Sequence, residues 1–279
     1  MADTFGDRVA AAVRATGPLC AGIDPSAELL HDWGLTDDAR GLRSFVATCV
    51  EAFAGEVGVI KPQAAFFERH GAAGMAELER LVADARNAGL VVIVDAKRGD
   101  IDTTAQAYAD AWLGDASPLA ADAVTAHPYL GLGALLPLVH LAAGNGRGVI
   151  VVVRSSNPEG RGLQQAVTAE GDSVEDSLLR GIAALNGSAG VPAGTVGAVI
   201  GATLPRSQFP LDQLRGVILA PGLGAQGAGP AEVAERFAGC APGSVLPSSS
   251  RGLLRHGPDP DALRSHARSL VRELSVAMG

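Results

Sequence analysis

The chain has 279 residues, of which 47% are hydrophobic, so it is long enough to bury a full core. It carries 22 Lys and Arg against 30 Asp and Glu, a formal net charge of −8. Such a balance argues against a nucleic-acid-binding protein, because that function needs a basic face to neutralise phosphates. A small phosphorylated ligand remains compatible, since a few cations and backbone amides can hold one locally.

No targeting or membrane segment is predicted. The N-terminus lacks a basic stretch followed by an apolar one, and no apolar run reaches the roughly 18 residues of a membrane span. Three scattered cysteines without a CxxC pair fit a reducing compartment and argue against a disulfide framework or a structural zinc site. We therefore expect a cytoplasmic protein without a membrane partner.

Short apolar runs recur along the chain, separated by longer Ala- and Leu-rich amphipathic segments. Most runs are β-branched or continuously apolar, which is typical of strands buried on both faces. The alternation predicts an α/β protein with a parallel sheet, and about eight strands favour a closed (β/α)8 TIM barrel over an open doubly wound sheet. No low-complexity linker divides residues 1–279, so we expect a single domain. The predicted strands are 19–23, 57–60, 90–94, 121–125, 148–153, 196–200, 216–220 and 244–246.

Two helices are predicted most clearly. Ile101, Ala105, Tyr108 and Trp112 lie on one stripe of a helix. The last helix, near 259–278, is expected to pack against the outside of the barrel.

Polar residues gather just after the predicted strands, where the loops of a (β/α)8 barrel build the active face. Seven of the eight strands are followed by such residues, which is hard to attribute to chance. They are Asp24, Lys61, Asp95 with Lys97, His127, Ser155-Ser156-Asn157, Pro221–Gly229 and Ser248–Arg251.

The segment around Asp95 and Lys97 is the most informative about function. They are two residues apart at a strand end, so both side chains can point into the barrel mouth. Asp100 begins the next helix, where a carboxylate is favoured as a cap, so a salt bridge plus an N-cap is the simplest interpretation. Lys61 and Asp24 on neighbouring strands enlarge this cluster, and desolvating such charges requires close mutual pairing. The pattern suits decarboxylation, in which a carboxylate held near Asp95 is lost as CO2 and Lys97 stabilises and protonates the carbanion.

These motifs resemble the orotidine 5′-phosphate decarboxylase family, in particular its longer form found in mycobacteria and other bacteria. Asp95-x-Lys97-x-x-Asp100-Ile101-x-x-Thr104, with Lys61 one strand earlier, is similar to the family signature. The similarity covers most of the chain. The other matching segments are Gly22-Ile23-Asp24-Pro25, Ile60-Lys61-Pro62-Gln63, Ser155-Ser156-Asn157-Pro158, Pro221-Gly222-Leu223-Gly224-Ala225-Gln226 and Ser250-Arg251-Gly252.

The resemblance implies decarboxylation of orotidine 5′-monophosphate to UMP and CO2, the last step of de novo UMP biosynthesis. It implies no metal and no organic cofactor. Lys61, Asp95, Lys97 and Asp100 would form the charge network, with Lys97 as proton donor to C6.

The resemblance also implies roles in binding. Asp24 and Lys61 would hold ribose hydroxyls, and Ser156 would read the pyrimidine edge. The phosphate would lie in the segment that begins at Pro221, held by Gln226, Arg251 and the backbone amides around Gly224 and Gly252. Asp100, Ile101 and Thr104 would reach into the partner's site, which makes the enzyme a homodimer. The natural closing loops are 156–162 and 221–229, both rich in Gly and Pro.

The sequence also departs from the compact members of this family. The stretch 158–173 and the region after Thr104 are longer, and Asp102 stands where a small residue is commoner. The choice of Ser156 over Ser155 as the base-reading residue is therefore less firmly based than the charge network. His127, in a His-Pro pair, is interpreted as a structural rather than a catalytic histidine.

Three alternative functions share some of these features. Sugar-phosphate decarboxylases of the same superfamily, such as 3-keto-L-gulonate 6-phosphate decarboxylase, share Asp-x-Lys-x-x-Asp but place a metal-binding carboxylate where this chain has Lys61, which would repel Mg2+. Gly222-x-Gly224-x-x-Gly227 matches a dinucleotide-binding pattern, yet it does not open a helix directly. A non-catalytic phosphate-binding barrel would not need four paired charges.

Overall fold

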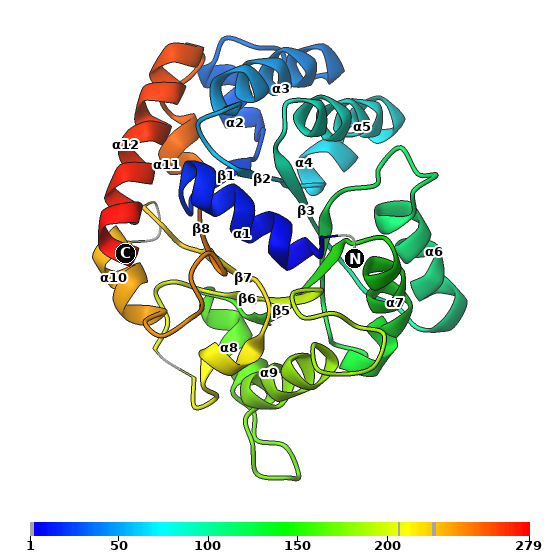
Figure 1. Cartoon of the computed structure of the whole chain (residues 1–279). Coiled ribbons are helices and arrows are strands. Elements are labelled where there is room, and N and C mark those ends of the chain that lie inside the picture. Colours follow the sequence, from blue (N-terminus) through cyan, green and yellow to red (C-terminus); the bar gives the residue numbers. More distant parts are fainter. Residues whose placement is uncertain (1–2, 206, 225–226) are drawn as a thin grey trace.

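The computed structural model describes residues 3–205, 207–224 and 227–279. Eight parallel strands follow one another around a closed barrel, and β1 completes the ring by pairing with β8. Helices surround this ring (Figure 1). The predicted (β/α)8 barrel is confirmed, and an open doubly wound sheet is excluded. The strands are β1 Cys20–Ile23, β2 Val59–Pro62, β3 Val91–Arg98, β4 Ala123–Ala126, β5 Gly148–Arg154, β6 Val196–Ile200, β7 Ile218–Pro221 and β8 Val245–Ser249.

The helices follow the order expected of the fold, with one exception. Between β6 and β7 the described residues form only a short 3-10 helix, η3. The predicted last helix is confirmed as α12, which packs against α3 and α10. The helices are α1 Phe5–Thr16, α2 Ala27–Asp32, α3 Ala39–Phe53, α4 Ala65–Glu68, α5 Gly71–Asn87, α6 Asp102–Leu113, η1 Leu132–Leu135, α7 Leu136–Gly144, η2 Pro158–Gly160, α8 Arg161–Gln164, α9 Val174–Leu185, η3 Leu211–Leu214, α10 Pro230–Arg236, α11 Arg251–Leu254 and α12 Pro260–Met278.

β3 and β8 are the strands that run furthest past their predicted apolar runs. β3 continues past Val94 to Arg98, and β8 continues past Leu246 to Ser249. In both, the extra residues are polar or small and lie at the carboxyl end of the barrel. A hydrophobic pattern cannot find them, because these strand ends face the barrel mouth rather than an apolar layer.

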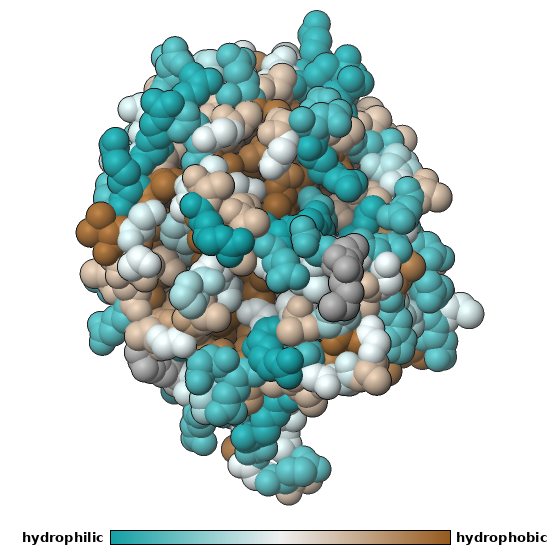
Figure 2. All heavy atoms as spheres, viewed as in Figure 1, coloured by the Kyte–Doolittle hydropathy of each residue, from teal (hydrophilic) through white to brown (hydrophobic). Residues whose placement is uncertain are grey.

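The core has two layers, one inside the barrel and one between the sheet and the helices. Phe5 and Val9 of α1 are fully buried and belong to the inner layer. Figure 1 shows α1 lying across the end of the barrel at which the strands begin. A Cβ on Gly148 would come within 2.3 Å of the Phe5 ring, so glycine is required for this close approach. In the same view, hydrophilic side chains cover most of the outer helices (Figure 2).

Among the described residues, no helix is both long and apolar enough to cross a membrane.

We expect Phe5→Ala to lower the free energy of unfolding by about 3–5 kcal/mol, because it leaves a cavity at the end of the barrel. Urea denaturation measures this loss. Val276→Ala in α12 is the control, since Val276 is 86% exposed and its truncation should change stability by less than about 0.5 kcal/mol. Equal effects of the two substitutions would contradict the role of α1 as a plug.

Candidate active site

A cavity of about 540 Å3 opens at the carboxyl end of the barrel. It brings together residues from four separate parts of the sequence, which follow β1, β2, β7 and β8. Four of them belong to the predicted site or to its phosphate-binding backbone: Asp24, Gly224, Arg251 and Gly252. Sequence analysis did not single out three other lining residues, Leu29, Phe66 and Arg255.

A charged network lies beside this cavity and shares Asp24 with it. Asp95 is at its centre: Oδ1 lies 2.6 Å from Lys97 Nζ, and Oδ2 lies 3.4 Å from Lys61 Nζ. Lys61 Nζ is also 3.7 Å from Asp24 Oδ1. Lys61 and Asp95 are buried, whereas the Lys97 side chain is half exposed. Four of the predicted residues, which come from β1, β2 and β3 or directly follow them, therefore do come together.

Two further side chains complete the surroundings of Asp95. The Thr125 hydroxyl donates to Asp95 Oδ1 at 2.8 Å and accepts from the Lys97 backbone N–H at 2.9 Å. Gln63 Nε2 donates to Asp95 Oδ2 at 3.2 Å. Sequence analysis placed Thr125 only in a strand and gave Gln63 no role, because neither residue type is typical of catalysis. Both carboxylate oxygens thus have two partners, which offsets the cost of burying this charge.

The local shape of β3 explains why both Asp95 and Lys97 reach the mouth. The four-residue step from Val94 to Arg98 lies opposite the two-residue step from Val124 to Ala126 on β4, so β3 bulges between them. Lys97 has a φ of +48°, in the left-handed region that disfavours residues with a side chain. A sequence pattern does not reveal this conformation.

The network shifts the titration of its members. Burial raises the pKa of Asp95, but the ammonium groups of Lys61 and Lys97 outweigh it and hold the pKa of that carboxyl below its usual value. Burial lowers the pKa of Lys61, but Asp24 and Asp95 outweigh it and raise that pKa above its ordinary value. Both groups are therefore charged at neutral pH. Because the pKa of Asp95 is depressed, the stability it adds is present above the unfolded-state pKa of about 3.9 and is lost only as the pH falls through its lower folded-state pKa.

Lys61 and Lys97 are the only two lysines of the chain, since its other cationic side chains are arginines or histidines. An arginine keeps its proton under all physiological conditions, whereas a lysine can release and regain one. The presence of only two lysines in the sequence therefore distinguishes Lys61 and Lys97 from the other cationic residues.

Asp100 lies outside the network of its own chain. Its carboxylate accepts a hydrogen bond from the Ile101 N–H at 2.8 Å, and among the described residues it makes no ion pair. The predicted N-cap role of Asp100 is wrong, because α6 begins at Asp102 with Ile101 as N-cap and without a side-chain cap. Asp102, the first residue of α6, has a φ of +48°, in the left-handed region that disfavours residues with a side chain. Ile101 and Thr104 are exposed.

The loop after β5 distinguishes its two serines. Gln164 of α8 makes two hydrogen bonds with Ser155. Its Oε1 accepts from the Ser155 N–H at 3.1 Å, and its Nε2 donates to Ser155 Oγ at 2.8 Å. Ser155 is thus hydrogen-bonded within its own loop. The long stretch after Pro158 forms η2, α8 and a turn closed by a bridge between Val167 and Ser173.

The predicted phosphate end follows β7 and β8. Pro221 ends β7, and Gly222, Gly224 and Gly227 all have positive φ values that only glycine adopts freely. Gly229, not Gly227, is the N-cap of α10, so this glycine pattern does not open a helix as a dinucleotide fingerprint does. Gln226 lies outside the described residues. Arg251 begins α11 and lines the cavity.

His127 contacts Arg98 and Gly99 at the end of the β3 segment. Its backbone N–H donates to the Arg98 carbonyl at 3.0 Å, and its ring packs against Gly99, where an added Cβ would lie 3.1 Å from the ring. The added Cβ would also lie 2.6 Å from the His127 carbonyl oxygen, so glycine is required at this position.

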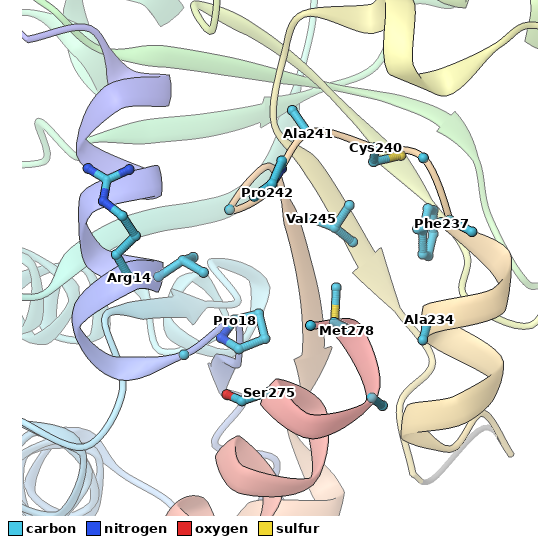
Figure 3. Close-up of a pocket in the computed structure, with 17 residues that line it drawn as sticks. Arg14, Pro18, Ala234, Phe237, Cys240, Ala241, Pro242, Val245, Ser275 and Met278 are labelled. Carbon is cyan, nitrogen blue, oxygen red and sulfur yellow. The ribbon is translucent and has the colours of Figure 1, made fainter.

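A second cavity, of about 490 Å3, lies at the other end of the barrel (Figure 3). Residues from α1, the segment after α10 and the end of α12 line it, including Arg14, Cys240, Pro242 and Met278. Pro18 and Val245 also line it, and they lie at the amino ends of β1 and β8. It contains none of the predicted site residues.

We expect Thr125→Val to lower the free energy of unfolding by about 1–3 kcal/mol, because Asp95 and the Lys97 N–H each lose a buried partner. Thr125→Ser keeps the hydroxyl and loses one methyl group, which costs about 0.8 kcal/mol. Denaturation of both variants tests the hydroxyl bridge. If the valine variant were as stable as the serine variant, the bridge would contribute nothing.

Comparisons with known proteins agree with this geometry. A model of the Orotidine 5'-phosphate decarboxylase / HUMPS family matches residues 17–265. The orotidine 5'-phosphate decarboxylase of Streptomyces coelicolor is 50% identical over 277 residues, which are 99% of both chains. A crystal structure of a protein assigned as an orotidine 5'-phosphate decarboxylase from Streptomyces avermitilis superposes with a TM-score of 0.93 at 50% identity, covering 99% of this chain and 96% of that one. The Leishmania donovani OMP decarboxylase structure gives a TM-score of 0.76 at 29% identity, with 99% of both chains covered.

Since the family match spans most of the chain and the relatives align over nearly its whole length, the chain belongs to the orotidine 5'-phosphate decarboxylase / HUMPS family.

Proposed function

We propose that this protein decarboxylates orotidine 5′-monophosphate to UMP and CO2 without a metal or organic cofactor. The observation that carries the proposal is the contact between Lys97 Nζ and Asp95 Oδ1 at 2.6 Å, in a family that includes decarboxylases of this nucleotide. This contact places an ammonium donor and a buried carboxylate side by side at the barrel mouth. No other pair among the described ion pairs joins a half-exposed lysine to a buried acid.

The reaction needs one bond to break and one to form at C6 of the pyrimidine. The bond between C6 and the carboxylate carbon breaks, CO2 leaves, and the electron pair stays on C6. Lys97 then donates a proton from Nζ to C6, which gives UMP, and regains a proton from water. Asp95 faces the substrate carboxylate before this step and the Lys97 ammonium throughout, so it disfavours the anionic substrate and orients the acid.

Asp24 is suited to bind a ribose hydroxyl. Its Oδ1 is buried and accepts no hydrogen bond within the described residues, although Lys61 lies nearby. A buried carboxylate oxygen in this state favours a ligand that donates a hydrogen bond. Asp24 also lines the cavity, so a sugar hydroxyl placed there would satisfy it.

Arg251 and the glycine-rich segment after Pro221 are suited to bind the phosphate. The planar guanidinium group matches phosphate oxygens, and backbone with positive φ at Gly222 and Gly224 can approach them closely. Gln226 is proposed as a further ligand there, and Ser156 as the residue that reads the base. Binding energy from the phosphate can stabilise the transition state at C6 if the loops close over the nucleotide.

A homodimer would complete the site. Among the described residues Asp100 has no ionic partner, and the adjacent Ile101 is 52% exposed. Tyr129 and Leu130, which follow β4, are 74% and 50% exposed, so this side of the mouth presents apolar surface. We propose that Asp100, Ile101 and Thr104 enter the partner's site, where Asp100 joins the network around Lys97.

The position of Lys61 separates this function from the sugar-phosphate reactions of related barrels. Its ammonium group lies between Asp24 and Asp95, where a divalent cation would be repelled. We further propose that residues 1–279 act as one domain and that the protein works in the cytoplasm, as a biosynthetic enzyme would.

Lys97→Ala should lower kcat for orotidine 5′-monophosphate by at least about 10²–10⁴-fold, because the proton donor is lost. The assay follows the fall in substrate absorbance in the presence of EDTA. Lys97→Arg is the matched variant: it keeps the positive charge but cannot readily give up its proton, so it should not restore activity. Turnover of a sugar phosphate that depends on added Mg2+, with none of the nucleotide, would overturn the proposal.

Mixing the inactive variants Lys97→Ala and Asp100→Ala should restore activity if the sites are shared. After subunit exchange, half of the dimers are hybrids, and each hybrid has one site with both native residues, so about a quarter of wild-type activity is expected. As a control, each variant is carried through the same subunit-exchange procedure alone. No recovery, despite hybrids detected by native mass spectrometry, would show that Asp100 acts within its own chain.

A further inference from the structure

Lys97 is held in an unfavourable backbone conformation. Its φ of +48° places the Cβ close to neighbouring backbone, and such conformations persist only where the surroundings determine them. The Asp95 carboxylate fixes the tip of its side chain and the Thr125 hydroxyl fixes its N–H. Neither contact fixes the carbonyl side of Lys97, where the chain continues into Arg98.

Arg98 supplies that missing restraint. Its Nη1 donates to the Ala96 carbonyl at 3.1 Å, so the side chain reaches back across Lys97 to the residue before it. The Arg98 carbonyl accepts from the His127 N–H at 3.0 Å, and Arg98 pairs with Ala126 where the ladder resumes after the bulge. Contacts made by Ala96 and Arg98, the residues before and after Lys97, therefore restrain the Lys97 backbone on both sides.

The Arg98 guanidinium is itself held by two helices. It forms an ion pair with Glu68, the last residue of α4. Its Cζ lies 5.9 Å from the ring centre of Tyr108 and 5.6 Å from that of Trp112, both on α6. A planar guanidinium can donate along its edge and lie against aromatic rings at the same time, which an ammonium group cannot.

These two helices flank the segments that carry the charge network. α4 follows β2, which bears Lys61, and α6 follows the segment that bears Asp100. A displacement of Arg98 would therefore disturb its contacts with both helices, one before and one after Lys97 in the sequence.

We propose that Arg98 is a positioning residue that holds the Lys97 backbone, and with it the Lys97 ammonium, in place for proton transfer. This inference rests on the proposed decarboxylation and assigns a further residue to it. Arg98 does not touch the substrate; it acts through Lys97. An acid displaced by about 1 Å can lose about 10²-fold in rate, so a backbone restraint of this kind affects kcat more than binding.

The test compares Arg98→Met and Arg98→Lys with the wild-type dimer. The methionine variant should lower kcat by about 10–10²-fold while KM changes by less than about threefold. Arg98→Lys should recover only part of this loss, because a single ammonium group cannot make the hydrogen bond, the ion pair and the aromatic contacts of the planar guanidinium at the same time. Glu68→Gln should have a smaller effect than Arg98→Met and add nothing to it, since both substitutions act through the same guanidinium.

The neighbouring ion pair of Arg69 with Asp37 provides the matched control. Its side chains are 33% and 44% exposed, close to the 27% and 35% of Arg98 and Glu68. Arg69→Met should leave kcat within about twofold of wild type, as expected for an exposed pair away from the reacting groups. If both methionine variants lowered kcat and Tm together, Arg98 would have a structural role only. Full recovery by Arg98→Lys would show that charge alone matters and would also overturn the proposal.

Hydrogen exchange at the Lys97 amide tests the restraint without any substrate. Thr125 accepts from this N–H, so loosening of the backbone should raise its exchange rate by about tenfold in Arg98→Met and leave it unchanged in Arg69→Met. A wild-type enzyme that turned over no nucleotide, with this exchange result intact, would overturn the proposed function and not the restraint. Unchanged exchange in Arg98→Met would overturn the restraint.

Discussion

The pairing of one buried carboxylate with two ammonium groups is the interaction on which the rest of the site depends. Asp95 accepts Lys97 on one oxygen and Lys61 on the other, and Thr125 and Gln63 donate to it as well. Removing a charge from water is costly, so this arrangement is stable only because each member is paired. The barrel supplies that geometry, since residues distant in the sequence meet at the carboxyl ends of adjacent strands. The two lysines also differ in their surroundings, because Lys61 is buried between two acids whereas Lys97 remains half exposed.

The bulge in β3 links this network to the rest of the fold. It brings Asp95 and Lys97 to the mouth together, but it also forces Lys97 into a left-handed conformation. The surrounding contacts from Thr125, Arg98 and His127 hold that shape. Local strain at a functional residue is thus maintained by ordinary structural contacts around it. In the proposed mechanism, stability and function are linked in this segment, because the hydrogen bonds that close the ladder beyond the bulge also hold the backbone of the proposed acid.

Much of the architecture could be predicted from the sequence, because strands buried on both faces leave continuous apolar runs. All eight runs correspond to strands, and the charged residues that follow them do converge. The ends of β3 and β8 were predicted too short, since polar residues at the mouth carry no apolar pattern. The helix start at Asp100 was wrong, because a left-handed Asp102 is not visible in composition. The contacts of Thr125, Gln63 and Arg98 join residues far apart in the chain, and no local spacing predicts them.

The central claim is that Lys97, aimed by Asp95, lies against C6 of a bound pyrimidine nucleotide. A crystal structure of the protein with UMP tests this most directly. We predict C6 within about 3–3.5 Å of Lys97 Nζ, the separation of reacting atoms in a near-attack arrangement. The phosphate should lie against Arg251 and the ribose against Asp24. A nucleotide bound with C6 remote from Lys97, or bound only in the cavity at the other end of the barrel, would contradict the claim.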